Sequence, residues 1–232
     1  MVLPIKGIQK LSLIDYPGKL CATIFLGGCN FRCPFCYNSM LVLEPEALPT
    51  IPEREVLKLL MERRGFLDGI CVGGGEPTIH RELPQFLYKV KSLGLLVKLD
   101  TNGSRPWMLE DLLKRSLVDY VAMDIKVPLR RYKEVVGREI PLSAIYQSIR
   151  LLRRGRVDYE FRTTVVPGIV SESDLIEIAD FLKGSKRYVI QQFRPVNTIN
   201  PSLMEVKPYS KEELQRFREQ IFHYFGECKA RF

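Results

Sequence analysis

The feature that most constrains the fold is an alternation of six short apolar segments with longer amphipathic ones. The short segments are rich in β-branched and aromatic residues and lack period-two polarity, which is typical of strands buried on both faces. They predict strands at Leu20–Leu26, Gly69–Gly73, Leu95–Asp100, Tyr120–Lys126, Tyr159–Val166 and Tyr188–Phe193. The stretches between and after them predict helices at Glu53–Arg64, Leu83–Leu93, Leu109–Arg115, Ala144–Arg154, Ser173–Lys183 and Ser210–Phe225. This alternation predicts an α/β fold with a parallel sheet, and it fits a partial barrel and an open doubly wound sheet equally well.

Unusual polar motifs follow the first four predicted strands. A cysteine cluster follows the first strand, Gly73–Pro77 the second and Asp100–Gly103 the third, and Asp124–Lys126 ends the fourth. In both candidate architectures ligands bind at the carboxyl ends of the strands. The sequence therefore predicts a functional site at this edge of the sheet.

Composition excludes several classes of protein. The chain has 232 residues, of which 46% are hydrophobic, and we expect residues 1–232 to form one domain. Residues 1–10 lack the pattern of a signal peptide, and no apolar run approaches the roughly 20 residues of a membrane helix, so we expect a cytoplasmic protein without a membrane partner. The net charge of +8 is dispersed; its densest group, Arg150–Arg156, ends a predicted helix, where cations are favoured. No nucleic-acid-binding module accompanies it, so we do not expect a nucleic-acid partner.

The cysteine cluster has the spacing C-x3-C-x2-C, formed by Cys29, Cys33 and Cys36. Thiolates are soft ligands for iron–sulfur clusters and zinc. Electron-carrying clusters normally use four cysteines, so three predict a cluster in which one iron remains open to a substrate. The alternatives are a zinc site completed by one of the two histidines, and a set of inert buried thiols. Three further cysteines lie outside the cluster: Cys21, Cys71 and Cys228. We interpret Cys21 and Cys71, which fall in predicted strands, as buried apolar residues, and Cys228 has no predicted role.

This cysteine motif, placed after a first strand, resembles the signature of the radical S-adenosylmethionine superfamily. The resemblance implies that Cys29, Cys33 and Cys36 bind a 4Fe–4S cluster whose open iron chelates S-adenosylmethionine. It also implies reductive cleavage of that cofactor to a 5′-deoxyadenosyl radical, which abstracts hydrogen. The implied fold is a partial (β/α)6 barrel, and no catalytic side chain is expected beyond the cluster and the cofactor.

Further motifs resemble cofactor-binding elements of the same family. Gly74, Gly75, Glu76 and Pro77 resemble the element that contacts the methionine amino group. Two later segments resemble those of glycyl-radical-enzyme activases, in which such residues contact S-adenosylmethionine and a monovalent cation: Asp100, Thr101, Asp124 and Lys126. There the resemblance implies that Asp124 binds the cation and Lys126 reaches the cofactor.

Two arginines complete the predicted cofactor contacts. Arg162 lies within an apolar strand, and arginine is rarely buried unpaired; its likeness to the fifth strand of the activases implies a contact with the cofactor carboxylate. Arg194 follows the sixth strand, about where pyruvate formate-lyase activase has a histidine. A second departure is Tyr37, where related activating proteins often have a histidine after the third cysteine.

The segment Gly7–Lys19, a loop by its local pattern, resembles anaerobic ribonucleoside-triphosphate reductase activating proteins, together with Gly28–Asn38 and the QFRP element at Gln192–Pro195. The implied reaction removes a hydrogen atom from a backbone glycine of a partner enzyme. We expect that partner to be a glycyl-radical enzyme such as the anaerobic ribonucleotide reductase, and the electron donor to be a flavodoxin or a ferredoxin. The alternatives are a radical enzyme acting on tRNA or a small molecule, and a non-catalytic iron–sulfur or zinc-binding module.

Overall fold

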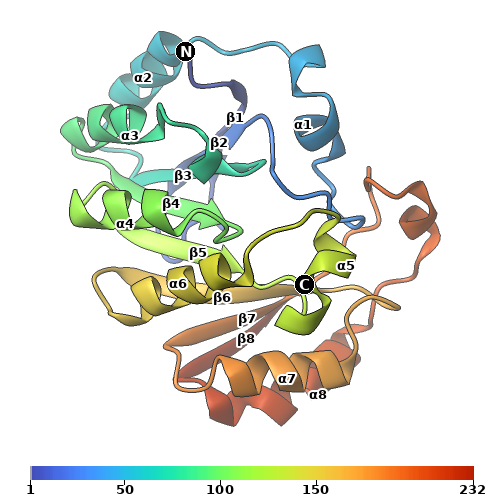
Figure 1. Ribbon diagram of the computed structural model, residues 1–232. Coiled ribbons are helices and arrows are strands. Elements are labelled where there is room, and N and C mark those ends of the chain that lie inside the picture. Colours follow the sequence, from blue (N-terminus) through green and yellow to red (C-terminus); the bar gives the residue numbers. More distant parts are fainter. Residues whose placement is uncertain (1) are drawn as a thin grey trace.

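The computed structural model describes residues 2–232; Met1, which the predicted domain includes, lies outside them. The described chain is built on a sheet of eight strands in sequential order, β1 to β8 (Figure 1). β1 runs antiparallel to β2, and every later neighbour is parallel. The strands are β1 (Ile5–Ser12), β2 (Cys21–Leu26), β3 (Gly69–Gly74), β4 (Leu96–Thr101), β5 (Tyr120–Asp124), β6 (Asp158–Val165), β7 (Arg187–Gln192) and β8 (Glu227–Arg231).

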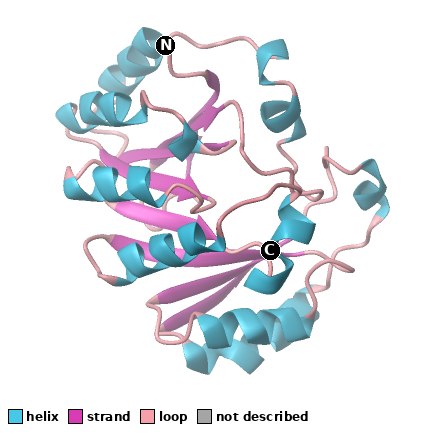
Figure 2. Ribbon diagram, in the orientation of Figure 1, coloured by secondary structure: helices cyan, strands magenta, loops and turns pink. Residues whose placement is uncertain are grey.

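Helices cover only the outer face of this curved sheet (Figure 2). Six helices form that layer: α2 (Glu53–Glu62), α3 (Leu83–Ser92), α4 (Pro106–Lys114), α6 (Leu142–Arg153), α7 (Glu172–Phe181) and α8 (Lys211–Ile221). A doubly wound sheet would carry helices on both faces. The sheet is therefore an open partial barrel, which confirms the predicted fold class.

The two faces of the sheet bury different kinds of side chain. On the outer face, residues such as Ile24, Val72 and Leu99 join the helices in one large apolar core. At alternating positions, Cys21 and Cys71 belong to a second, smaller cluster that also contains Tyr16, Tyr120 and Ala122. Because successive strand residues point to opposite faces, this second cluster lies on the inner face. The inner face also carries the polar residues of the site.

The six predicted strands are confirmed as β2 to β7, with ends displaced by no more than two residues. Two strands were missed, because both are sheet edges with many polar residues: β1 and β8. The prediction of a loop at Gly7–Lys19 is wrong over its first half, since Ile5–Ser12 forms β1. The predicted fourth strand is two residues too long, so Lys126 follows β5 rather than ending it.

The predicted helices are confirmed with shifted ends. The last of them ends earlier than expected, because α8 stops at Ile221 and a 3-10 turn follows at Phe222–Tyr224. A capping box starts this helix, with Ser210 and Glu213 each accepting from the other's backbone N–H.

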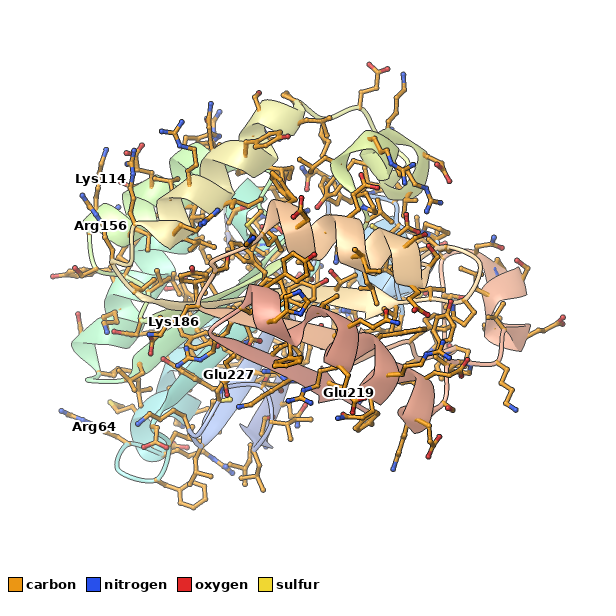
Figure 3. All side chains as sticks on the ribbon, turned by 90° about the horizontal axis from the view of Figure 1, so that it is seen from below. Arg64, Lys114, Arg156, Lys186, Glu219 and Glu227 are labelled. Atoms are coloured by element: carbon orange, nitrogen blue, oxygen red, sulfur yellow. The ribbon has the colours of Figure 1, made fainter. Side chains whose placement is uncertain are left out.

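Loops and short helices gather beyond the carboxyl ends of the parallel strands, on the right of Figure 1. They include α1 (Ser39–Leu43), α5 (Tyr132–Val136) and the 3-10 helix η4 (Pro201–Glu205). Charged side chains near the opposite edge are labelled in Figure 3: Lys114 ends α4, and Arg64, Arg156 and Lys186 lie in the turns that precede β3, β6 and β7. Within residues 2–232, none of the helices has the length and apolarity needed to cross a membrane.

Candidate functional site

The three clustered cysteines lie on the loop that leaves β2 at the carboxyl edge of the sheet. Cys33 is buried, Cys29 and Cys36 are half-buried, and all three thiols are free. Backbone hydrogen bonds tie this loop to three later segments, two of them loops and one the end of α5. Near its start, Gly28 O accepts from Glu76 N at 2.9 Å, and Arg32 N donates to Val136 O at 2.7 Å. Near its end, Pro34 O accepts from Asn200 N at 2.9 Å, so the loop is held by segments far apart in the sequence.

Burial keeps these thiols protonated in the absence of a metal. It raises the pKa of Cys29 to about 12 and that of Cys33 to about 11, although Lys126 opposes the shift at both. Metal binding requires the thiolate and releases the proton. The residues fit a cluster, because each thiolate of a cluster takes its own iron. Among the described residues, no three His, Cys, Asp or Glu side chains converge on a single metal position.

The glycine-rich loop after β3 packs directly against the cysteine loop. Gly74 has a φ of +102°, a conformation that only glycine adopts readily. A Cβ atom on Gly75 would lie 1.8 Å from Gly28 O, so only a glycine permits this approach of two backbones. Gly74 O accepts from the Asn38 side-chain amide at 3.1 Å. The glycine-rich loop and the cysteine loop are therefore packed backbone against backbone.

The side chain of Glu76 is buried and points into the protein rather than toward solvent. Its side chain is 1% exposed and accepts hydrogen bonds from Asn102 N at 2.6 Å, Thr101 Oγ1 at 2.7 Å and Thr78 N at 3.0 Å. Burial raises the pKa of this carboxyl, against the lowering effect of these donors. Glu76 thus joins the loops after β3 and β4, and a cofactor at this point would meet the loop's backbone rather than this carboxylate.

Five charged side chains form one network on the inner face, drawn from β4, β5, β6 and the residues just beyond β5. Arg162 lies between two aspartates, donating from Nε to Asp124 Oδ1 at 2.8 Å and from Nη1 to Asp100 Oδ2 at 3.1 Å. Lys126 Nζ donates to Asp124 Oδ2 at 2.9 Å. Lys98 Nζ donates to Asp100 Oδ1 and lies 3.5 Å from Cys71 Sγ.

The charges of this network stabilise one another. Burial alone would raise the pKa of Asp124, but Arg162 and Lys126 hold it below its ordinary value. Burial would likewise raise the pKa of Asp100, which Arg162 and Lys98 hold low. Burial would lower the pKa of Lys126, whereas Asp124 raises it. All five groups are therefore charged at neutral pH, and they carry a net charge of one positive unit.

The structure brings most of the predicted site residues to one place. Cysteine loop, glycine-rich loop and charged network meet at the carboxyl edge of β2 to β6. Thr101 is the exception among the strand residues, because its hydroxyl faces Glu76. Arg194 is exposed and lies two residues beyond the end of β7. Tyr37 lies near the charged network and is 55% exposed, so both side chains are accessible from solvent.

Sequence reasoning missed several residues of the site. Lys98 is 1% exposed at the inner end of the network, and the signal for it was a single charge within an apolar run. Asn102 donates to Asn30 Oδ1 at 3.0 Å, and Asn30 donates to Ser104 Oγ at 2.8 Å. These amides connect the cysteine loop to the loop after β4, and nothing in their local sequence distinguishes them from ordinary turn residues.

Comparison with known proteins agrees with this fold and identifies the family. A family model for the radical SAM superfamily matches residues 23–182. The chain therefore belongs to the radical SAM superfamily. Membership implies S-adenosylmethionine and a 4Fe–4S cluster as cofactors, and the cysteine loop described above fits such a cluster.

Among individual relatives, a Methanocaldococcus jannaschii protein provisionally named a glycyl-radical enzyme activating enzyme is 37% identical over 219 residues, covering 91% of this chain and 88% of its own. An S-adenosylmethionine-dependent nucleotide dehydratase from Lacinutrix mariniflava is 27% identical, covering 82% of this chain but 41% of its own.

Solved structures share the fold at low sequence identity. SuiB of Streptococcus suis has a TM-score of 0.68 at 16% identity, covering 88% of this chain. The chain spans about half the length of SuiB, 47% by coverage. A domain of a pyruvate-formate lyase-activating enzyme from Bacteroides vulgatus has a TM-score of 0.57 at 17% identity, covering 71% of this chain and 99% of that domain.

Proposed function

We propose that this protein is a glycyl-radical-enzyme activase. Residues 1–232 would act as one radical SAM unit that cleaves S-adenosylmethionine and removes a hydrogen atom from a backbone glycine of a partner enzyme. The observation that carries the proposal is the convergence of the cysteine loop, the Gly73–Pro77 loop and the charged network at one edge of the partial barrel. The similarity to the Methanocaldococcus jannaschii protein along nearly the full length of both chains supports the type of reaction.

Each part of the site has a proposed role. Cys29, Cys33 and Cys36 hold the cluster, which together with S-adenosylmethionine supplies a carbon-centred radical. The backbone of Gly74 and Gly75 offers carbonyl acceptors for the cofactor's amino group, while Glu76 and Pro77 fix that backbone.

The charged network has the proposed role of binding the carboxylate end of the methionine portion of S-adenosylmethionine. Arg162 and Lys126 lie beside the partly exposed aspartates and carry the charge that attracts the cofactor carboxylate. Arg194 stands at the rim, where a side chain can reach an adenosine group. Monovalent-cation binding is not part of this proposal, because fixed cations already contact Asp100 and Asp124.

The partner we propose is an anaerobic ribonucleotide reductase, with a flavodoxin or a ferredoxin as the electron donor. Support comes from the likeness of Gly7–Lys19, Gly28–Asn38 and the QFRP element to the activating proteins of that reductase. A glycine loop of another protein also needs an accessible site. Tyr37 and Arg194 are exposed.

The test is anaerobic incubation of the reconstituted protein with S-adenosylmethionine, a reductant and the candidate reductase. We expect 5′-deoxyadenosine and a glycyl-radical doublet in electron paramagnetic resonance. Cys33→Ala should abolish both signals, whereas the matched control Cys228→Ala, a buried cysteine of β8, should retain them. Cofactor cleavage without a doublet would refute the partner, and cleavage by Cys33→Ala would refute the cluster assignment.

A second candidate is a radical enzyme that acts on a small molecule. The specific observation in its favour is the similarity to the S-adenosylmethionine-dependent nucleotide dehydratase over 82% of this chain. Cofactor cleavage that nucleotides stimulate, and that a glycyl-radical enzyme does not, would support it. tRNA as the substrate would instead give binding that weakens steeply with salt.

A further inference from the structure

Asp124, which the activase resemblance assigns to a monovalent cation, and its neighbour Asp100 are both already neutralised by the chain itself. Each of their four oxygens contacts a basic side chain: Asp100 contacts Lys98 and Arg162, and Asp124 contacts Arg162 and Lys126. Three basic side chains therefore form ion pairs with two carboxylates. A sodium or potassium ion at this point would be the fourth positive charge around two negative ones.

The remaining oxygen expected near such an ion is also engaged. Thr101 Oγ1 donates to Glu76 Oε1 at 2.7 Å and accepts from Gly103 N at 3.1 Å. Its hydroxyl is consequently turned into the protein and away from Asp100. The site thus fits a bound monovalent cation poorly, both in its charge and in its oxygen ligands.

Lys98 is the residue that creates this surplus of positive charge. Its side chain is 1% exposed, and its ammonium lies between the Asp100 carboxylate and the Cys71 thiol. Burial, together with the nearby Asp100 charge, raises the pKa of Cys71 well above its ordinary value, so that thiol is neutral. Asp100 is therefore the one anion in contact with the Lys98 ammonium, and a buried ammonium needs such a partner.

The position of Lys98 is that of a counter-ion behind the site. Lys98 and Asp100 are two residues apart on β4 and so share the inner face of the sheet. Lys98 precedes Asp100 and therefore lies further from the carboxyl edge of the sheet. Asp100 is 28% exposed in its side chain, whereas Lys98 is closed off from solvent. The Asp100 carboxylate can thus face a ligand on its exposed side while the buried Lys98 ammonium neutralises its charge from the other side.

We infer that the ammonium of Lys98 takes the place of a monovalent cation, so that this protein binds S-adenosylmethionine without sodium or potassium. The inference rests on the proposed cofactor site but not on the identity of the partner enzyme. Lys98 acts here as a positioning residue: it orients and neutralises Asp100 and does not touch the reacting atoms.

The test compares potassium, sodium and choline chlorides at equal ionic strength, using the protein with its cluster reconstituted. Equilibrium dialysis gives the S-adenosylmethionine affinity, and thermal unfolding without S-adenosylmethionine reports cation binding directly. We expect the wild-type affinity to change less than twofold among the three salts, with no saturable change in Tm. Lys98→Met should bind at least tenfold more weakly in choline, and potassium or sodium should restore its affinity and raise its Tm saturably.

The matched control is Lys91→Met, which removes a lysine paired with Asp119 at 2.7 Å, remote from the site; it should behave like the wild type in every salt. Saturable stabilisation of the wild-type protein by potassium or sodium would overturn the inference even if Lys98→Met failed to fold. Salt-independent, undiminished binding by Lys98→Met would overturn it as well. Absence of S-adenosylmethionine binding by the wild type in all salts would refute the proposed function, and the Tm comparison would still decide the question of the cation.

Discussion

Gly75→Ala tests whether the contact between the glycine-rich loop and the cysteine loop controls activity. The added Cβ would lie 1.8 Å from Gly28 O and 2.6 Å from Gly28 C, whereas non-bonded heavy atoms pack at about 3.5 Å. Both contacts are with backbone atoms, so no side-chain rotation relieves them. The two loops must separate by more than about 1 Å.

The cost follows from what that separation breaks. Gly75 N donates to Leu26 O at 2.8 Å, and Glu76 N donates to Gly28 O at 2.9 Å. Each bond contributes about 1 kcal/mol net, and overpacking adds about 1–3 kcal/mol. We therefore expect a loss of about 3–5 kcal/mol in the free energy of unfolding, or roughly 6–20 °C in Tm for a chain of this size.

Activity should fall further than stability alone explains. A displacement of about 1 Å in a positioning element costs about 10²-fold in rate, so 5′-deoxyadenosine formation should drop by about that factor at temperatures where the variant is folded. Gly7→Ala is the matched control, since its Cβ would meet only Phe25 side-chain atoms at 3.5 Å or more. Wild-type cleavage and Tm in Gly75→Ala would refute the claim that this backbone contact positions the cofactor.

Three further predictions concern the charged network and the thiols. Arg162→Met leaves Asp100 and Asp124 facing each other without their shared partner; urea denaturation should show a loss of about 3–5 kcal/mol, and an unchanged midpoint would contradict it. The pKa of Asp124 is lowered in the folded protein, so its contribution to stability is complete above the unfolded pKa of about 3.9 and is lost as the pH falls below that value. Asp124→Asn should therefore lower Tm at pH 7 and flatten the acid limb of a curve of Tm against pH. An acid limb identical to that of the wild type would refute this. Burial raises the pKa of Cys29 to about 12 and that of Cys33 to about 11, so the cluster-free protein should react slowly with iodoacetamide at pH 8. Cluster assembly at that pH should release protons, which a pH indicator in weak buffer would detect. Fast alkylation would contradict the argument that burial keeps these thiols protonated.

The sequence predicted the central strands well because each is buried on both faces. Val72 and Leu99 face the helices while Cys71 faces the interior of the barrel, which gives the continuous apolar runs on which the prediction depended. The edge strand β8 has the sequence ECKAR, with charges at three of its five positions. Such an edge strand resists aggregation, and for the same reason its sequence does not show it to be a strand.

The site was predictable where a motif carried its own chemistry. The spacing of the three cysteines and the run Gly73–Pro77 point to their place on the carboxyl edge. Lys98 was not predictable, because its significance comes from Asp100 two residues later and from Cys71 on the neighbouring strand. The inward orientation of Glu76 also depends on Asn102, a residue 26 positions later in the sequence. Only the assembled sheet brings these partners together.

The tie between the cysteine loop and Asn200 also sets the order in which this protein can mature. On a ribosome, Cys36 emerges long before residues 199 and 200, whose backbone N–H groups bond to Cys36 O and Pro34 O. At about 5–20 residues per second, that interval lasts roughly 10–30 s. Throughout it the loop that carries the three thiols lacks the two hydrogen bonds that fix its carboxyl-terminal part. A cluster delivered after synthesis of residues 199 and 200 would meet a loop that these hydrogen bonds already fix, and the length of chain between the proposed ligands and that segment sets the earliest moment at which this can happen.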